Sequence, residues 1–155
     1  MRGFKLAAVA FGGVALAIVP GIVMLTSSAG AASVQQVTVP EADRFTPFAI
    51  TIKAGDTVKW VNNDTDDHTV VSDDPFVTAG NTGTNHLLPG TDSNGGHAGV
   101  FTLQFTHVGA FVYYCRFHSH LDAFNQPVAP GPRGGIQDAH GNFGTPMMGV
   151  ITVVP

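Results

Sequence analysis

The chain has 155 residues, of which 44% are hydrophobic, and it contains 19 glycines and 10 prolines. This length suits one compact domain, and the glycine and proline content indicates many turns. The formal net charge of −4 argues against a nucleic-acid-binding protein, because such proteins carry a basic surface. The single cysteine excludes an intramolecular disulfide.

Residues 1–32 are expected to lie outside the folded domain, which then covers residues 33–155. Arg2 and Lys5 precede an apolar run over residues 6–25, and small residues follow, which is the order found in a secretory signal peptide. A run of about 20 apolar residues is also long enough to span a membrane, so an N-terminal anchor is the alternative. Both interpretations predict an extracytoplasmic protein, in the periplasm, at the cell surface or secreted.

The rest of the chain is predicted to form short strands separated by turns, without a helical period. The expected strands cover residues 35–39, 46–53, 57–61, 68–71, 100–105, 111–115 and 150–153. Residues 73–99 have the composition of an irregular connection, and residues 108–110 that of a turn. Such a pattern indicates an antiparallel β-sandwich or barrel.

Apolar residues alternate along two of these strands. Phe101, Leu103 and Phe105 share one face of their strand, because side chains repeat every two residues. By the same rule, Tyr113 and Cys115 share a face, so the thiol is expected to point toward the core.

Cys115 lies three residues before His118, at the end of an apolar and aromatic run. A thiolate and an imidazole at this spacing can bind one soft or borderline metal ion, and copper in electron-transfer sites prefers this combination. A lone cysteine can also be a small buried hydrophobic residue. The metal interpretation therefore depends on ligands from elsewhere in the chain.

Three segments, in order, resemble the cupredoxin family, in particular plastocyanin, amicyanin and pseudoazurin. They are residues 59–64 leading to His68, residues 114–118, and residues 147–153. The resemblance implies an all-β, Greek-key sandwich or barrel that binds one copper ion per chain. The ligands that it implies are His68, Cys115, His118 and, at the axial position, Met147.

The segment between the last two implied ligands, residues 119–146, is much longer than the family resemblance implies. It is predicted to be a long loop rather than an additional sheet. Met148 and Gln126 are the alternatives for the axial ligand. His120 is expected either to be solvated or outside the ligand shell, or to join the site or form a second one with Asp122, Gln126 or His140. Apolar side chains in the loop are expected to form a docking patch around His118, namely Leu121, Ala123, Phe124 and Val128.

The leading functional hypothesis is an exported blue copper protein that carries single electrons between redox partners, membrane-associated or soluble, and is not an enzyme. The alternatives are a mononuclear copper enzyme with an oxygen ligand or an open axial position, and a copper-binding or delivery module outside the cytoplasm. Trp60 is expected in the core, and the remaining histidines are expected to be solvated in loops. These are His86, His97, His107 and His140.

Overall fold

The computed structural model describes residues 30–72, 83–131 and 144–155, and a compact unit extends from Ala31 to Pro155. The strands of the described residues are β1 (Val34–Val39), β2 (Ala49–Lys53), β3 (Thr57–Asn62), β4 (His68–Ser72), β5 (Thr84–Leu88), β6 (Gly99–Gln104), β7 (Gly109–Tyr114), β8 (His120–Leu121), β9 (Pro127–Val128) and β10 (Met148–Val154). Within these ranges, no helix is long and apolar enough to cross a membrane. The apolar run over residues 6–25 lies outside the described residues.

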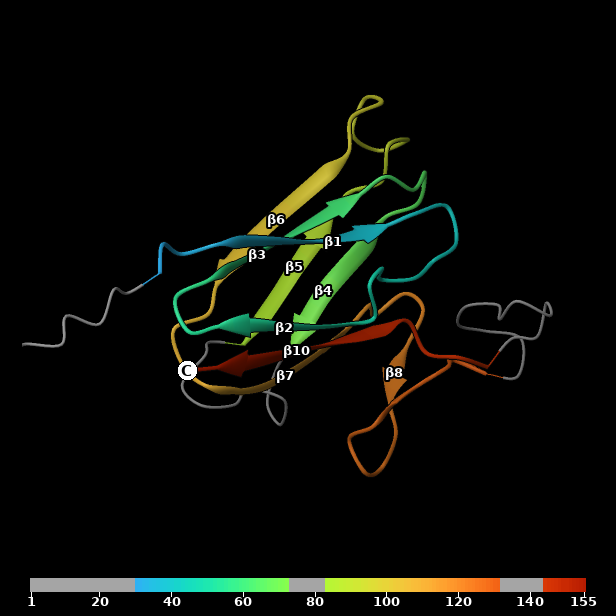
Figure 1. The fold of residues 1–155 in the computed structure, drawn as a ribbon. Coiled ribbons are helices and arrows are strands. Elements are labelled where there is room, and N and C mark those ends of the chain that lie inside the picture. Colours follow the sequence, from blue (N-terminus) through green and yellow to red (C-terminus); the bar gives the residue numbers. More distant parts are fainter. Residues whose placement is uncertain (1–29, 73–82, 132–143) are drawn as a thin grey trace, which may run out of the picture. The chain divides into compact units, whose positions relative to one another are not determined.

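Two sheets form the body of the domain (Figure 1). One has the strand order β1-β3-β6 and the other the order β2-β10-β7-β4-β5. The all-β prediction is confirmed, but the sheets are mixed rather than antiparallel, because β1 pairs with β3 and β2 pairs with β10 in parallel. These parallel pairs arise because the chain passes from one sheet to the other between β1, β2 and β3.

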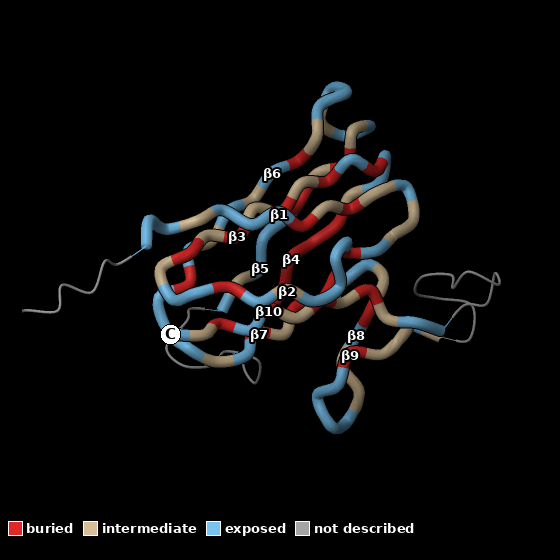
Figure 2. Tube along the Cα trace, in the orientation of Figure 1, coloured by how far each residue is buried: buried red, intermediate tan, exposed pale blue. Residues whose placement is uncertain are grey.

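The core lies between the two sheets and contains the residues that the alternating pattern selects (Figure 2). In β3, every second side chain from Val58 onward is buried, including Trp60. The Trp60 ring meets the Tyr113 ring edge-on, with 5.4 Å between their centroids. Phe105 and Cys115 are also fully buried. The predicted inward direction of the thiol and the core position of Trp60 are thereby confirmed.

The sequence predicts an irregular connection over residues 73–99, but the strand β5 lies within this range, so the prediction is wrong there. Residues 73–82 lie outside the described residues. The strand β5 lies at the edge of its sheet, and of its side chains only Leu88 is buried. An edge strand needs few apolar residues, so its sequence resembles that of a loop. His86 is exposed but belongs to this strand, and its ring stacks on Phe101 at a centroid distance of 4.1 Å.

Two strand boundaries also differ from the prediction. The strand expected from residue 46 begins only at Ala49, because Pro47 has no N–H for a ladder, and Thr46 forms an isolated bridge with Thr38. At the other position, Gly109 begins β7 instead of forming a turn. Its φ of 147° suits glycine, so the residue continues into the strand.

The predicted long loop over residues 119–146 contains a small sheet of its own. Strands β8 and β9 pair antiparallel, which corrects the expectation of no additional sheet. The Asp122 carboxylate closes the turn between them by accepting hydrogen bonds from the N–H groups of Phe124 and Gln126. A pair of two-residue strands leaves no alternating pattern in the sequence, so only the turn residues mark it. Residues 132–143 lie outside the described residues.

Candidate metal centre

The ends of three neighbouring strands bring the expected ligands together. Tyr114, the last residue of β7, pairs with Val71 of β4 on one side and with Met148 of β10 on the other. Cys115 follows Tyr114 directly, so it lies at the end of the sheet where β4 and β10 begin. His68 is the first residue of β4, so ladder pairing carries both side chains to the same end of the domain.

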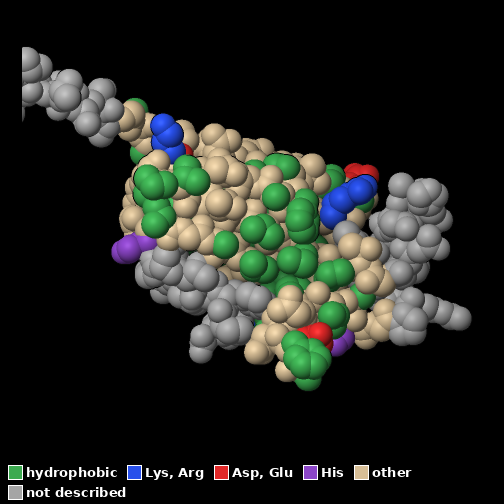
Figure 3. Space-filling view, turned by 60° about the horizontal axis from the view of Figure 1, so that its bottom comes forward, with side chains coloured by type: hydrophobic (Ala, Val, Ile, Leu, Met, Phe, Trp, Pro, Cys, Tyr) green, Lys and Arg blue, Asp and Glu red, His purple; other side chains and the backbone are tan. Residues whose placement is uncertain are grey.

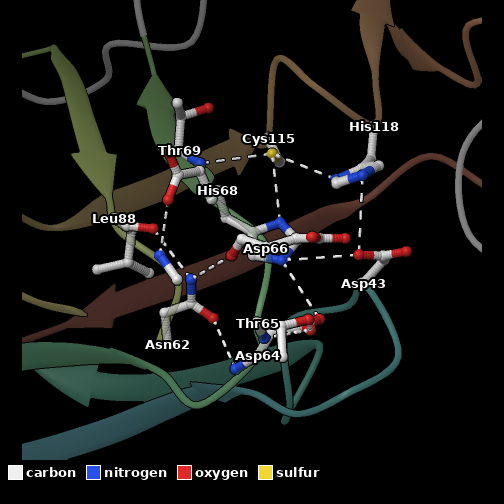
Figure 4. Close-up of polar contacts among 12 residues, drawn as sticks. Asp43, Asn62, Asp64, Thr65, Asp66, His68, Thr69, Leu88, Cys115 and His118 are labelled. Atoms are coloured by element: carbon white, nitrogen blue, oxygen red, sulfur yellow. Dashed lines mark hydrogen bonds and ion pairs between the residues drawn. The ribbon is translucent and has the colours of Figure 1, made fainter. Parts of the chain in front are cut away.

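The thiol of Cys115 lies between two imidazole rings (Figure 4). Its Sγ atom is 3.7 Å from Nδ1 of His68 and 3.6 Å from Nδ1 of His118. The ligand atoms of the three residues all lie within 4.8 Å of one another. His68 and Cys115 are fully buried, whereas His118 is partly exposed.

These distances fit a metal ion held between the three side chains. A trigonal or tetrahedral metal bonded to sulfur at about 2.3 Å and to imidazole nitrogen at about 2.0 Å holds these two atoms about 3.5–3.7 Å apart. Both Sγ–Nδ1 distances have this value. One thiolate and two imidazoles are the donor set of copper electron-transfer sites. The residues present therefore fit copper.

Met147 is the best-placed of the three candidates for an axial ligand. Its side chain is fully buried, whereas Met148 is half-buried and Gln126 is exposed. The N–H of Cys115 donates to the carbonyl of Met147 at 3.0 Å, so the two backbones are adjacent. Gln126 lies in the β8–β9 turn, where its N–H is bonded to Asp122.

The surroundings of Cys115 favour the thiolate. Burial raises the pKa of the Cys115 thiol, but hydrogen bonds from the rings of His118 and His68 and from the N–H of Thr69 outweigh burial and lower the pKa from 9.0 to about 6. The Thr69 N–H donates to Sγ at 3.4 Å. For His118, the hydrogen bond to Cys115 raises the pKa above its ordinary value, although burial opposes it. A thiolate is the form that binds a metal.

The loop between β3 and β4 is held by the buried side chain of Asn62. Its amide donates to the carbonyls of Asp66, at 2.8 Å, and Leu88, at 3.0 Å, and its oxygen accepts from the N–H of Asp64 at 3.0 Å. Gly90 packs against this loop so closely that a Cβ atom there would collide with the carbonyl oxygen of Thr65. The Asn62 hydrogen bonds and the close packing of Gly90 together fix the position of His68, the first residue of β4.

Thr69 is a site residue that sequence reasoning missed. Besides its N–H bond to Cys115, its hydroxyl oxygen accepts a hydrogen bond from the N–H of Arg116 at 2.9 Å. The same residue thus connects the segment of His68 to the segment of Cys115. The only signal in the sequence is its place directly after the histidine.

The sequence also did not indicate two carboxylates, those of Asp43 and Asp64, which lie near the Nε2 atoms of the histidine rings, on the side away from Cys115. Asp64 Oδ2 is 3.4 Å from Nε2 of His68, and Asp43 Oδ1 is 3.6 Å from the same atom. Asp43 Oδ1 is also 3.7 Å from Nε2 of His118. Burial raises the pKa of Asp64, but hydrogen bonds from Thr65 and His68 outweigh it, so the pKa lies below its ordinary value. No spacing in the sequence connects Asp43 with the histidines.

The segment after His118 begins and ends close to the site. The Met147 N–H donates to the carbonyl of His118, and the buried Ser119 hydroxyl donates to the carbonyl of Met147 at 3.1 Å. His120 is exposed, and within the described ranges it belongs to no cluster of close metal-ligating side chains. His140 lies outside the described residues.

Large apolar side chains are exposed on the segment that contains His118. Phe117 is 54% exposed and Phe124 is 82% exposed. Of the other residues expected in a patch here, Ala123 is exposed, whereas Leu121 and Val128 are half-buried. Figure 3 shows hydrophobic side chains gathered on the face that comes forward from the bottom of Figure 1. Such surfaces are frequent at protein–protein contacts.

The chain is similar to two plastocyanins. It is 35% identical over 94 residues to the chloroplastic plastocyanin of Tetradesmus obliquus, which covers 61% of this chain and 63% of that protein. This match spans less than two thirds of the Tetradesmus protein. The chain is 34% identical over 74 residues to plastocyanin of Scenedesmus fuscus, and this match covers 48% of this chain and 74% of that protein. Among solved structures, a purple cupredoxin from Nitrosopumilus maritimus is 20% identical to this chain, with a TM-score of 0.46. The superposition covers 77% of this chain and 98% of that protein.

A family model also matches. Residues 33–124, more than half of the chain, match the model described as copper binding proteins, plastocyanin/azurin family. This range contains three of the four expected ligands, and the structure brings those three together. The chain belongs to the plastocyanin/azurin family of copper-binding proteins, the cupredoxins.

Proposed function

We propose that this protein carries single electrons between redox partners through one copper ion held by His68, Cys115, His118 and Met147. The observation that carries the proposal is the pair of Sγ–Nδ1 distances of 3.7 and 3.6 Å around a buried thiol with a lowered pKa. Copper bound to one thiolate, two imidazoles and a weak thioether changes between Cu(I) and Cu(II) with little rearrangement.

The protein's own contribution is to bury three of the four proposed ligands away from water. His68 and Cys115 are fully buried, and the N–H bond from Thr69 holds the sulfur in place. The side chain of Met147 is buried as well. Fixed ligands mean that little energy is needed to reorganise the site when an electron arrives or leaves, which suits an electron carrier.

His118 is the proposed route for electrons between the site and a partner. Its ring is the ligand side chain with partial exposure, 21%, and the exposed Phe117 precedes it in the chain. A redox partner that covers Phe117 and Phe124 would bring its own centre toward this ring. We propose redox proteins as the partners, with the net charge of −4 favouring a basic surface on them.

We also propose that the protein works outside the cytoplasm. The basic, apolar and small-residue order of residues 1–32 supports export, with residues 6–25 as a cleaved signal or an anchor and residues 33–155 as the copper-binding domain. The test is the N-terminal sequence of the protein recovered from the producing cell and its distribution between soluble and membrane fractions.

The decisive experiment for the copper site is the visible and electron paramagnetic resonance spectrum of the protein loaded with Cu(II). We expect an intense blue band and a narrow copper hyperfine splitting, both lost on adding ascorbate and restored on reoxidation. Cys115→Ser is expected to lose the band. A weak spectrum with wide splitting would contradict the electron-carrier proposal and favour a copper enzyme with an oxygen ligand. The absence of stoichiometric copper would contradict both the carrier and the copper enzyme.

A further inference from the structure

Of the two carboxylates beside the histidine rings, Asp43 is the one that lies near both rings. It lies on the segment between β1 and β2, about 25 residues before the first expected ligand in the chain. Its Oδ1 atom nevertheless lies 3.6 Å from Nε2 of His68 and 3.7 Å from Nε2 of His118. One oxygen atom therefore contacts both imidazole rings, each on the side opposite Cys115 (Figure 4).

The chain holds Asp43 in this place from both sides. The segment that carries it is closed by two backbone hydrogen bonds between Thr38 and Thr46, each 2.8 Å long. Phe45 is buried in the core, where its ring meets Tyr113 edge-on with 4.8 Å between the centroids. Asp43 itself has a φ of 46°, a conformation that residues other than glycine adopt infrequently.

The chemistry of imidazole makes this contact relevant to the metal. A neutral imidazole that binds a metal through Nδ1 carries its proton on Nε2. A carboxylate on the Nε2 side then stabilises that tautomer, orients the ring and makes Nδ1 a stronger donor. Both Nδ1 atoms of this site face Cys115, and both Nε2 atoms face Asp43.

We propose that Asp43 is a positioning residue for the copper site: its carboxylate orients both histidine ligands and places a negative charge that favours Cu(II) over Cu(I). This inference rests on the proposed ligand set. Because the charge lies next to both rings, it stabilises the more positive ion more strongly. Its removal therefore raises the reduction potential.

Substitution of Asp43 is expected to leave the fold intact. The side chain is 38% exposed, and it borders an open pocket of about 410 Å³ that Glu41, Asp64, Thr65 and Asp66 also line. Glu41 is exposed and lies in the same turn, which makes Glu41→Gln a control with the same change in charge. Asp43→Asn removes the charge and keeps the shape, whereas Asp43→Ala removes both.

The experiment measures the reduction potential, the Cu(I) affinity by competition with a chromophoric chelator, and the Cu(II) spectrum of the full chain. For Asp43→Asn we expect the ratio of Cu(II) to Cu(I) affinity to fall about tenfold, the lower end of the range for lost partners of metal ligands. This change corresponds to a potential about 59 mV higher. Asp43→Ala is expected to show the same rise and a broadened spectrum, because the His118 ring loses the Asp43 carboxylate, whereas the His68 ring keeps Asp64 at 3.4 Å.

Four results have distinct meanings. Unchanged potentials and spectra in both Asp43 variants would overturn the inference, and so would an equal rise in Glu41→Gln, which would mean a general effect of the acidic pocket. A rise confined to the Asp43 variants supports it. If the unmodified protein lacks the thiolate band, the proposed function fails first, so the two failures are distinguishable.

Discussion

At the scale of single residues, Met147 and Met148 differ in the burial of their side chains. Met147 is fully buried beside Cys115, whereas the neighbouring Met148 is half-buried within β10. The buried side of β10 continues through Gly149 and Ile151. Alternation along the strand thus gives Met147 the core side and Met148 the opposite side.

This difference predicts different outcomes for two similar substitutions. Met147→Leu removes a thioether sulfur that donates electron density, so the reduction potential should rise and the blue spectrum should change shape. Met148→Leu should leave both as they are. Leucine nearly conserves the volume of methionine, so each change should destabilise the fold by less than about 1.5 kcal/mol. Cyclic voltammetry and absorption spectra of the two variants provide the measurement, and the opposite pattern would make Met148 the axial ligand.

A second prediction concerns the ionisation of Cys115 without metal. Its pKa of about 6 lies below the ordinary value of 9.0, so the copper-free folded protein should hold a thiolate at pH 7.5. Because the pKa in the unfolded chain is higher, unfolding at pH 7.5 should take up a proton and reduce the thiolate absorbance in the ultraviolet. The stabilisation that the thiolate provides should be lost as the pH falls through about 6.

His118→Ala is the matched variant for this titration. It removes the first of the hydrogen bonds that lower the pKa of Cys115, so the titration should move to higher pH. A thiol in the unmodified protein that titrates near its ordinary value would contradict the geometry described for the three side chains.

At the scale of elements, the loop between β3 and β4 depends on Asn62. This side chain makes three hydrogen bonds to backbone groups, and it is fully buried. Alternation explains its direction, since Asn62 continues the buried face of Val58 and Trp60 beyond the last apolar residue of β3. The loop is therefore attached to the core by the same periodicity that builds the strand.

Asn62→Ala should consequently lower the free energy of unfolding by about 2–3 kcal/mol, because buried backbone groups lose their partners. Asn63 is adjacent but exposed, so Asn63→Ala should change the stability by less than about 0.5 kcal/mol. Urea unfolding of the two copper-free variants compares them. Equal stabilities would show that the loop holds its shape without the Asn62 bonds.

At the scale of the whole molecule, the expected ligands connect segments that are distant in the chain. His68 and Cys115 are 47 residues apart, yet they meet at one end of the two sheets. A metal that binds only the folded arrangement stabilises it by mass action. The loops at this end should therefore gain most from copper.

Copper should raise the stability of the domain by about 2.7 kcal/mol when free copper exceeds its dissociation constant a hundredfold. Cys115→Ser should abolish most of this gain, because it removes the thiolate. Thermal unfolding of both proteins with and without copper measures the effect. A similar gain in the variant would point to copper bound elsewhere on the protein.

Much of this protein follows from local sequence patterns. Period-two alternation identified the buried faces around Trp60, Tyr113 and Cys115, because each strand must bury one side against the opposite sheet. The segments around His68 and Cys115–His118 resembled a known copper-binding family, and the family match and the proximity of their side chains agree with that resemblance.

Other features were decided only by the tertiary structure. The edge strand β5 and the β8–β9 pair have too few buried residues to leave a pattern in the sequence. The contacts of Thr69 with Cys115 and of Asp43 with both histidines join segments that are far apart in the chain, so no spacing encodes them. Local patterns report which side of a strand is buried, whereas the neighbours of a polar side chain depend on how the strands and loops assemble.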